Sequence, residues 1–557
     1  MDLKGPDLTI DTIPTSHPAR RAVIGDMIRR NSVRYPDREA IVVPVGKANP
    51  VRRSIAYAEL NSKVNRLAHA LAAQGIGHGD VVATMGRNCP EWIITFYAAL
   101  KLGAVVTGVN YTFTSSEIRY QLIHSGAKAV VVEDRFVEKI EALGDPLPAL
   151  KVRVVNDVYG DTAGASWLRL STLLVFDDDS EPVAHVQEDD LAILPYTSGT
   201  EALPKAIMVP HRNYLVSMIP SYITGIGLLE EDIWYYMLPF HTIAGMGVQI
   251  ALLSLANTVV LPMESTPAEA LAAMTDEKVT VIGQTPTFYL QLIGVPGFKD
   301  CDLSGIRRAI TYGGTMPQAM FDAFRGVAPG LEWVTLWSQS ELTQTPTIGR
   351  FRSLSDIPHG DASWIGRPTS QLEVRVVDEN DIDVEPGVEG ELICRSPGVM
   401  LGYLGNPEKT ASVIRGGWLH TGDMVRRDEA GNLFFVDRQK DVIKSGGMNV
   451  SSVEVERTIY QHGSVLEVGV VGLAHEYWSQ AVTAFIVVRP GEEVDPVELI
   501  AFCKERLAGF KVPKQVRIVE SLPKDTQGKM LKRELRRAAE AEAKAGVESG
   551  DTPATES

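Results

Sequence analysis

Cysteine is scarce in this chain of 557 residues. The cysteines are far apart in the sequence and form neither a CxxC pair nor any spacing typical of metal ligands. They are Cys89, Cys301, Cys394 and Cys503. This distribution excludes a disulfide framework and a zinc module, and it predicts reduced, mostly buried thiols.

Long hydrophobic runs and an excess of positive charge are also missing. No uncharged apolar stretch approaches the roughly 18 residues that a membrane-spanning helix needs. Residues 1–20 contain no apolar segment of the kind found in a secretory signal. The net charge of −16 argues against nucleic acid or an anionic membrane as the main partner. We therefore expect a cytoplasmic protein with no integral membrane association.

The rest of the composition is that of an ordinary globular protein, with 45% hydrophobic and 22% charged residues. A chain of this length exceeds what one core accommodates, so at least two domains are expected. Apolar runs typical of strands, such as 40–43 and 81–84, alternate with helical periodicities, such as 57–74 and 92–101. This alternation predicts parallel sheets with helices on both faces.

A loop of small hydroxyl residues follows the buried apolar run at 191–194. It contains Thr197, Ser198, Gly199 and Thr200, and Lys205 stands just beyond it. Backbone N–H groups, hydroxyls and a lysine are the groups with which proteins hold phosphates. The spacing is not that of a P-loop. Taken alone, the segment could equally be a Ser/Thr-rich turn between two strands.

Other polar residues stand where strands are expected to end. The strand expected at 232–239 is followed by Phe240-His241, and the one at 310–315 runs into paired glycines. Trp337-Ser338-Gln339-Ser340-Glu341 follows a strand at 333–336. The Glu341 carboxylate is the hard oxygen ligand that Mg²⁺ prefers.

The last third of the chain adds three further motifs. The first is Thr421-Gly422-Asp423. The second is the segment from Asp437 to Asn449, which includes the pair Gly446-Gly447. The third is Pro523-x-x-x-x-Gly-Lys, which ends at Lys529. Each of them, taken alone, is also what an ordinary turn looks like.

In order and spacing, these segments together resemble the motifs of the adenylate-forming superfamily, which includes acyl-CoA synthetases, firefly-type luciferases and peptide-synthetase adenylation domains. The resemblance covers about residues 30–536. It implies a large α/β N-terminal domain of layered sheets and helices at 1–438. A small, mobile α+β C-terminal domain would occupy 439–536. Residues 537–557 are rich in Ala, Glu and Ser, and this composition predicts a flexible tail.

The resemblance also implies which residues contact ATP. Lys205 and the hydroxyls of the loop would hold the phosphates, Glu341 would bind Mg²⁺, and Asp423 with Arg438 would bind the ribose. Trp337 would stack on the adenine. The full set implied for the nucleotide and CoA is Thr197, Ser198, Gly199, Thr200, Gly314, Thr315, Trp337, Ser338, Ser340, Asp423, Arg438, Lys444, Gly446 and Gly447.

Catalysis and domain movement are assigned in the same way. Lys529 would bridge the carboxylate and the α-phosphate, and Lys205 and Glu341 would stabilise charge on the departing phosphates. His241 would be the gating aromatic residue beside the carboxylate. Lys440 would be the hinge about which the small domain rotates to bring Gly446 and Gly447 to CoA.

The expected acid pocket consists of small, mostly apolar residues, with one amide from the opposite side. Its members are Thr242, Ile243, Ala244, Gly245, Gly313 and Gln339. No charged residue is placed to bind an α-amino group, so amino acids are disfavoured. A medium- or long-chain fatty acid is the first expectation, and an aryl or cinnamate-type acid is the second.

The predicted activity is ATP-dependent acid–thiol ligation, with ATP, Mg²⁺ and CoA as cofactors and co-substrates. One alternative keeps the adenylation step but uses a carrier protein, an amine or an unusual oxyacid. Another is a nucleotide- or acyl-binding protein that has lost catalysis. A homodimer stays open as the oligomeric state.

The phosphate loop departs from the usual pattern of the superfamily, Thr-Ser-Gly-Thr-Thr-Gly-x-Pro-Lys-Gly. Here Glu201, Ala202 and Ala206 occupy the fifth, sixth and tenth positions. Glu201 would place a carboxylate close to the triphosphate, where like charges repel. The role of Glu201 is therefore left open.

Overall fold

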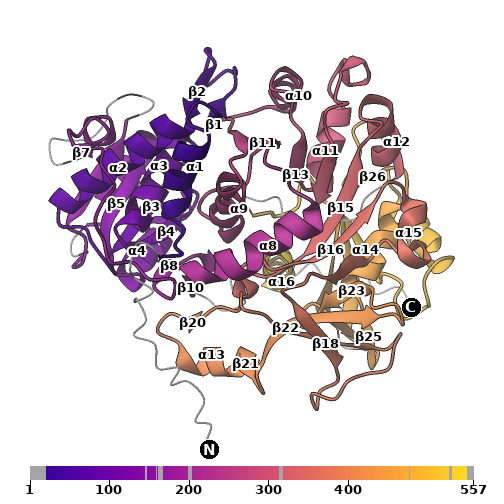
Figure 1. Ribbon diagram of the computed structural model, residues 1–557. Coiled ribbons are helices and arrows are strands. Elements are labelled where there is room, and N and C mark those ends of the chain that lie inside the picture. The colour runs from indigo at the N-terminus through magenta and orange to yellow at the C-terminus, as the bar shows by residue number, and fades with distance from the viewer. Residues whose placement is uncertain are drawn as a thin grey trace, which may run out of the picture.

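The computed structural model describes residues 20–144, 147–157, 160, 167–197, 204–312, 318–475, 477–525 and 530–548. Within these ranges the chain forms three sheets with helices packed around them (Figure 1). None of the described helices is long and apolar enough to cross a membrane.

The first sheet has nine strands, and its central strands run parallel. Those central strands are rich in valine and buried, as expected for a sheet covered on both faces. The strands are β3 (Val81–Met85), β4 (Val105–Val109), β5 (Ala127–Glu133), β6 (Val152–Asn156), β7 (Leu168–Arg169), β8 (Leu191–Ile193), β9 (Tyr196–Thr197), β10 (Lys205–Pro210) and β20 (Gly402–Tyr403).

The second sheet has fourteen strands, parallel from β1 to β15 apart from the edge strand β2, and antiparallel beyond β15. The strands are β1 (Glu39–Val43), β2 (Arg53–Ala56), β11 (Ile233–Tyr235), β12 (Thr258–Val260), β13 (Val281–Gln284), β14 (Arg308–Thr311), β15 (Glu332–Trp337), β16 (Thr347–Phe351), β17 (Trp364–Pro368), β18 (Glu373–Val377), β19 (Glu389–Arg395), β21 (Ile414–Arg415), β22 (Trp418–Arg427) and β23 (Leu433–Arg438).

Helices between the strands supply the apolar faces that cover these two sheets. They are α1 (Asp26–Arg34), α2 (Tyr57–Ala73), α3 (Pro90–Lys101), α4 (Ser115–His124), α5 (Val137–Glu141), α6 (Leu170–Leu173), α7 (His211–Asn213), α8 (Ile219–Ser221), α9 (Ile243–Ser254), α10 (Pro267–Asp276), α11 (Pro286–Ile293), α12 (Gln318–Val327) and α13 (Pro407–Val413). The π-helical turn Tyr214–Met218 joins α7 to α8, and a second π-helical turn, Tyr222–Ile226, continues from α8, so these segments form one irregular helix.

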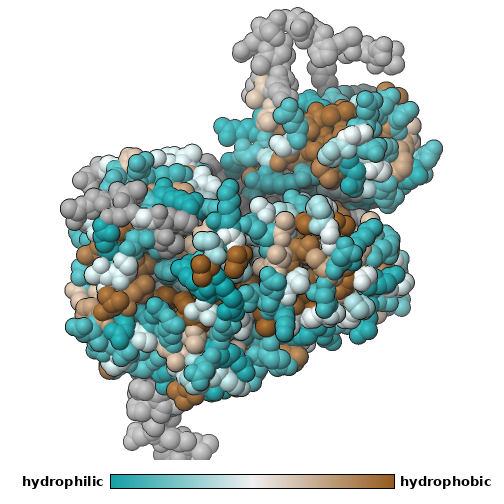
Figure 2. Space-filling model, turned by 90° about the horizontal axis from the view of Figure 1, so that it is seen from above, coloured by the Kyte–Doolittle hydropathy of each residue, from teal (hydrophilic) through white to brown (hydrophobic). Residues whose placement is uncertain are grey.

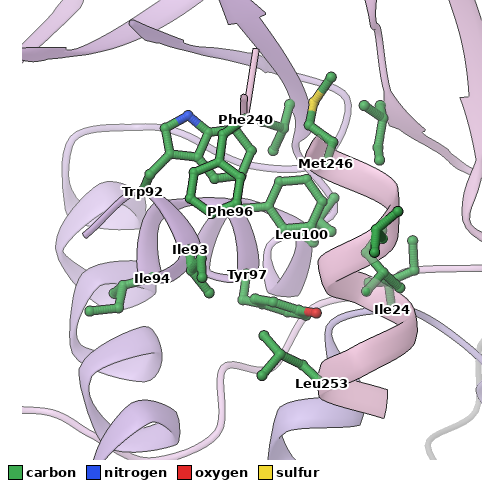
Figure 3. Close-up of a cluster of buried hydrophobic side chains, with 14 of the residues drawn as sticks. Ile24, Trp92, Ile93, Ile94, Phe96, Tyr97, Leu100, Phe240, Met246 and Leu253 are labelled. Carbon is green, nitrogen blue, oxygen red and sulfur yellow. The ribbon is translucent and has the colours of Figure 1, made fainter. Parts of the chain in front are cut away.

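The core between α3 and α9 fixes the segment that enters α9 (Figure 3). Phe240 stacks on Trp92 at 4.5 Å between ring centroids, and Trp92 stacks on Phe96 at 5.3 Å. Met246 of α9 belongs to the same cluster. His241, which follows Phe240, is therefore positioned by a tightly packed hydrophobic cluster.

The third sheet forms the small C-terminal domain, with α14 (Ser452–Tyr460), α15 (Pro496–Lys504) and α16 (Lys532–Glu548) beside it. Its strands are β24 (Ile443–Ser445), β25 (Met448–Val450), β26 (Val465–His475), β27 (Ser479–Val488) and β28 (Gln515–Ile518). Seen from above, the molecule consists of a large body and a smaller lobe, with hydrophobic side chains in small groups among hydrophilic ones (Figure 2).

The flexible tail expected from residue 537 onward is not what the structure shows up to residue 548. Helix α16 continues to Glu548. Leu535 and Ala539, one helical turn apart, are 5% and 2% exposed and join a core cluster with β26 and β27. The Ala- and Glu-rich composition that suggested disorder also favours a helix, and this apolar pair docks the helix on the sheet.

The strand expected at 232–239 is also shorter, because β11 ends at Tyr235. Beyond it, the chain is held in an irregular conformation by Asn88. Its side-chain amide donates to the Leu238 carbonyl at 2.8 Å and accepts from Phe240 N–H at 3.0 Å. Side-chain contacts therefore replace the strand pairing that the apolar pattern suggested.

The two domains meet where β23 faces α14. The Asp437 carboxylate accepts from the backbone N–H of Ser452 at 2.6 Å and from its hydroxyl at 2.7 Å. The Arg457 guanidinium lies 3.7 Å from the Asp361 carboxylate. The first turn of α14 is thus docked on a buried carboxylate of the large domain.

Candidate active site

Several predicted site residues lie outside the described part of the chain. They are Ser198, Gly199, Thr200, Gly313, Gly314, Thr315 and Lys529, together with Glu201 and Ala202 of the departing loop. Their roles stay predictions. The remaining site residues can be placed. Trp337 ends β15, Arg438 ends β23, and Asp423 lies within β22.

Asp423 is the centre of the best-defined part of the site. Its carboxylate is 2% exposed and accepts from Trp337 Nε1 at 2.8 Å and Gln339 Nε2 at 2.9 Å. Arg438, its register partner on β23, places Nε 3.5 Å from Oδ1. The Arg438 guanidinium, the Gln339 amide and the Trp337 indole thus hold the carboxylate in a fixed orientation.

The turn before Asp423 is built by local hydrogen bonds. Gly422 has φ +68, a conformation that favours glycine, and its N–H donates to Glu391 Oε1 at 2.9 Å. Thr421 Oγ1 accepts from the Asp423 N–H at 3.1 Å. His420 Nδ1 lies 3.0 Å from Glu391 Oε2. The Thr-Gly-Asp motif is therefore more than an ordinary turn, because Glu391 of β19 fixes it through hydrogen bonds.

The Trp337 side chain is 8% exposed and packs in a core cluster with Leu342 and Leu419. Its expected stacking on adenine stays a prediction. In this structure its indole N–H donates a hydrogen bond to the Asp423 carboxylate. The amide nitrogen of Gln339 also donates to the Thr421 carbonyl at 2.9 Å. Gln339 is thus placed with the Asp423 carboxylate, and its expected place in the acid pocket rests on the resemblance alone.

Glu341 lies in the 3-10 turn Ser340–Leu342 that follows β15. Tyr403 OH donates to Glu341 Oε1 at 2.8 Å, and the Met400 N–H donates to the Glu341 carbonyl at 2.8 Å. The Ser338 hydroxyl donates to the Thr345 carbonyl at 3.0 Å, which ties the two ends of this turn together. The sequence predicted a role for the Glu341 carboxylate, but it did not predict that Tyr403 positions this carboxylate.

Tyr403 also links Glu341 to the phosphate loop. Lys205 Nζ lies 5.6 Å from the centroid of the Tyr403 ring, and β20 pairs with β10. Thr197 is the register partner of Lys205 in the β9–β10 hairpin. The Lys205 ammonium and the Glu341 carboxylate thus lie beside the same tyrosine side chain.

The donor set around Glu341 fits a magnesium ion bound together with phosphates. Among the described residues, no group of three or more His, Cys, Asp or Glu side chains could hold a metal ion by itself. Mg²⁺ is usually bound by one or two carboxylates together with substrate phosphates and water. Glu341 would supply the protein ligand, and the ion would neutralise charge on the phosphates.

His241 follows the core residue Phe240 and immediately precedes the N-cap of α9. The backbone of His241 lies so close to β4 that a Cβ at Gly108 would be 2.4 Å from His241 Cα. The Tyr111 ring meets the imidazole edge-on at 5.7 Å. The Thr242 hydroxyl accepts from the Gly245 N–H at 3.1 Å and caps the helix.

Burial lowers the pKa of His241 to about 4, so its imidazole is neutral near pH 7. We expect the rate of pyrophosphate release to depend on pH in the same way for the wild type and His241→Phe between about pH 5.5 and 8. The variant should be slower at every pH, because the residue shapes the site. Initial rates across this range give the comparison. An inflection near the ordinary histidine pKa that vanishes in the variant would contradict a neutral role.

The first turn of α9 contains the other described residues of the expected acid pocket, Ile243, Ala244 and Gly245. Gly245 packs against the preceding loop so tightly that a Cβ there would lie 2.0 Å from the Pro239 carbonyl oxygen. Glycine is therefore required to bring this helix end next to the loop that contains His241.

The hinge and the expected CoA segment lie at the start of the small domain. Burial lowers the pKa of Lys440, and the nearby Arg438 guanidinium lowers it further. Gly446 and Gly447 have φ +59 and +79 at the tip of the β24–β25 hairpin, as a type I′ turn requires. Lys444 Nζ donates to Asn449 Oδ1 at 2.5 Å, which braces this hairpin.

Comparison with known proteins agrees with this geometry. Residues 28–404 match the AMP-binding enzyme family, and residues 454–529 match the AMP-binding enzyme C-terminal domain. The chain belongs to the AMP-binding enzyme family.

Curated relatives include CoA ligases for different acids. A feruloyl-CoA synthase from an Amycolatopsis species is 32% identical over 508 residues, which cover 90% of this chain and 98% of the relative. A long-chain-fatty-acid–CoA ligase from Bacillus subtilis (strain 168) is 29% identical, with coverage of 94% and 96%.

Solved structures show the same fold. The anthranilate CoA ligase AuaEII in complex with anthranoyl-AMP superposes with a TM-score of 0.83 at 26% identity, and the match covers 94% of this chain and 98% of that one. A fatty acyl CoA synthetase of Mycobacterium tuberculosis gives 0.72 at 29% identity, with coverage of 93% and 98%. The predicted adenylate-forming fold is confirmed, as is the type of enzyme, an AMP-forming CoA ligase that uses ATP, Mg²⁺ and CoA.

Proposed function

We propose that the protein activates an uncharged-tail carboxylic acid with ATP and transfers its acyl group to CoA. The observation that carries the proposal is the convergence of Trp337, Gln339 and Arg438 on the buried Asp423 carboxylate. Glu341 follows on the loop after β15. One carboxylate is thus rigidly held for a neutral diol such as ribose, and a second carboxylate is available to a metal ion.

In the first step, a carboxylate oxygen of the acid attacks the α-phosphorus, the bond to the β-phosphate breaks, and pyrophosphate leaves. Asp423 and Arg438 hold the ribose, so the reacting phosphate is positioned without a contact to it. Glu341 and Lys205 stabilise the charge on the departing phosphates. Lys529 bridges the two reacting anions, as the resemblance implies.

The arrangement of the domains suits this first step. Asp525, in the loop that leads to Lys529, is close enough to Tyr312 at the end of β14 to affect its hydroxyl. Burial raises the pKa of Tyr312 well above its usual range, and the charge of Asp525 contributes to this shift. The small domain thus brings Asp525 close to the end of β14 in the large domain.

In the second step, the sulfur of CoA attacks the acyl carbon, AMP leaves, and the thiol proton passes to solvent. We propose that rotation about Lys440 removes the loop containing Lys529 and brings Gly446 and Gly447 to the pantetheine arm. Both residues are glycines, which the positive φ angles favour, so the tip of the hairpin has no side chains and its backbone can approach a narrow ligand closely.

Pyrophosphate release with Mg-ATP tests the proposal, measured over straight-chain fatty acids and aryl acids with and without CoA. We expect release that is stimulated by CoA for one class of acid. Release without any effect of CoA would instead indicate a carrier protein or an amine as acceptor. If no acid in the panel caused pyrophosphate release, the result would contradict activation of these acids. It would favour an unusual oxyacid as substrate or a binding protein that has lost catalysis.

The partners in this proposal are small molecules, with no nucleic acid among them. We place the enzyme in the cytoplasm, which the free, mostly buried cysteines support. Sedimentation would decide between a monomer and the homodimer left open by the sequence.

A further inference from the structure

The C-terminal half of α4 contacts both ends of the predicted phosphate loop. His124 Nδ1 lies 2.8 Å from the hydroxyl of Tyr196, which belongs to β9 and leads into the loop. Tyr120 OH donates to the carbonyl of Pro204 at 3.2 Å, and Pro204 immediately precedes β10. One helix therefore holds the chain where it enters the loop and where it returns from it.

His124 also contacts the segment that carries Tyr403. Its imidazole is hydrogen-bonded to the carbonyl of Leu404. The Leu404 N–H in turn donates to the Ala206 carbonyl at 2.9 Å, and Tyr403 OH donates to Glu341 Oε1 at 2.8 Å. The same imidazole thus contacts the strand before the loop and the segment that positions the expected magnesium ligand.

The two ring nitrogens of His124 have different roles. Burial lowers the pKa of His124, and the bond to the Leu404 carbonyl opposes this shift only in part, so the imidazole is neutral near pH 7. A neutral imidazole has one N–H donor and one acceptor nitrogen. The Leu404 carbonyl can only accept, so it takes the N–H, and Nδ1 accepts from the Tyr196 hydroxyl. Both nitrogens are therefore used to hold the surrounding chain.

Helix α4 is a rigid support for these contacts. A capping box closes its N-terminus, because the Thr114 N–H donates to Glu117 Oε2 at 2.8 Å and Thr114 Oγ1 accepts from the Glu117 N–H at 3.4 Å. Ile118 and Leu122 are 0% and 2% exposed. They pack in the same core cluster as Leu194, which precedes the loop. The helix is therefore fixed at its start and along its buried face.

Tyr120 and His124 also support one another. They lie four residues apart on the helix, and their rings stack with centroids 5.2 Å apart and an interplanar angle of 22°. The His124 ring meets the Tyr196 ring edge-on, with centroids 5.8 Å apart. These ring contacts restrain the side chains in the orientation that the hydrogen bonds require.

Building on the proposed function, which assigns the phosphates of ATP to this loop, we propose that Tyr120 and His124 are positioning residues for the two phosphates that leave as pyrophosphate. They act through the ends of the loop and through the segment that carries Tyr403. A loop whose ends are fixed before binding loses less conformational entropy when ATP binds. The ribose is expected at Asp423 instead, so the binding of AMP does not depend on this support.

The test is calorimetric binding of Mg-ATP and of AMP, with no acid present so that no turnover occurs. His124→Leu removes two hydrogen bonds, so we expect it to raise the Kd for Mg-ATP by about tenfold with little change in the Kd for AMP. His124→Asn should restore part of the affinity, since its amide oxygen can accept from the Tyr196 hydroxyl. His69→Leu is the matched control and should change neither Kd, because His69 Nε2 of α2 is likewise bonded to a backbone carbonyl, that of Ser180 at 2.9 Å.

A second variant keeps the inference testable if His124→Leu does not fold. Tyr120→Phe removes a single oxygen and should raise the Kd for Mg-ATP severalfold, with little change in the Kd for AMP or in the melting temperature. An equal rise in the Kd for Mg-ATP and for AMP, or an unchanged Kd for Mg-ATP in both variants, would overturn the inference. Failure of the proposed function would instead appear as wild-type enzyme that releases no pyrophosphate with any acid, whereas the inference is decided by binding alone.

Discussion

Glu341→Gln should lower the rate of adenylation by about 100- to 1,000-fold, because a neutral amide is a poor ligand for Mg²⁺ and cannot balance charge on the phosphates. The amide can still accept the hydrogen bond that Tyr403 donates to Glu341 Oε1. The fold around the 3-10 turn should therefore persist. The measurement is the rate of ATP–pyrophosphate exchange as a function of Mg²⁺ concentration, with the melting temperature recorded alongside.

Two further variants show whether this effect arises at the metal site. Tyr403→Phe keeps the carboxylate but removes its hydrogen bond, so we expect an intermediate loss of about tenfold. Glu379→Gln makes the same chemical change on an exposed turn between β18 and β19 and should leave the rate unchanged. A Glu341→Gln enzyme with wild-type exchange and an unchanged dependence on Mg²⁺ would remove Glu341 from the proposed role.

The second large effect is expected for Asp423→Asn, which should raise the KM for ATP by about 10- to 150-fold. Hydrogen bonds to a charged acceptor are worth about 1.5–3 kcal/mol, and the substitution weakens those to the ribose. The KM for the acid should change much less, because Asp423 is expected to contact the ribose and not the acid. Steady-state kinetics with each substrate varied in turn separates the two.

Asp428→Asn provides the matched control for this experiment. Asp428 sits in the turn between β22 and β23 and is bonded to Asn432, so its loss should affect stability without changing the KM for ATP. Removing the charge of Asp423 also disturbs the Trp337 indole, and the melting temperature measures that cost. A parallel rise in both KM values would indicate a general disturbance of the site instead of a lost ribose contact.

Much of the fold could be predicted because its periodicities are strong. The helix at 57–74 and the strand at 81–84 correspond closely to α2 and β3, since apolar spacing and burial agree there. The strand expected at 232–239 was too long, because an apolar pattern does not reveal that the Asn88 side chain takes over the backbone hydrogen bonds. Helix α16 was not predicted, because only Leu535 and Ala539 dock it on the sheet and two apolar residues give no clear periodicity.

The motifs in the sequence predicted which residues belong to the candidate site, but they did not predict which of these residues contact one another. Asp423 and Arg438 were chosen separately, and only the register of β22 against β23 shows that they face one another. Tyr403 lies on a two-residue strand between recognisable motifs, and its sequence neighbours give no sign that it reaches Glu341.

The contact between Asp437 and the start of α14 has a consequence for the energetics of the catalytic cycle. A negative charge at a helix N-terminus is favourable by about 0.3–1 kcal/mol at exposed sites, and by more where it is partly buried. Rotation of the small domain would separate Ser452 from this carboxylate, so α14 would lose its anion and Asp437 would have to be hydrated or find new donors. Under the proposed mechanism, this contact favours the arrangement in which Asp437 accepts from Ser452. Only a second substrate with higher affinity for the rotated arrangement can reverse that bias, so under this mechanism CoA is both the acceptor and the ligand that drives the rotation.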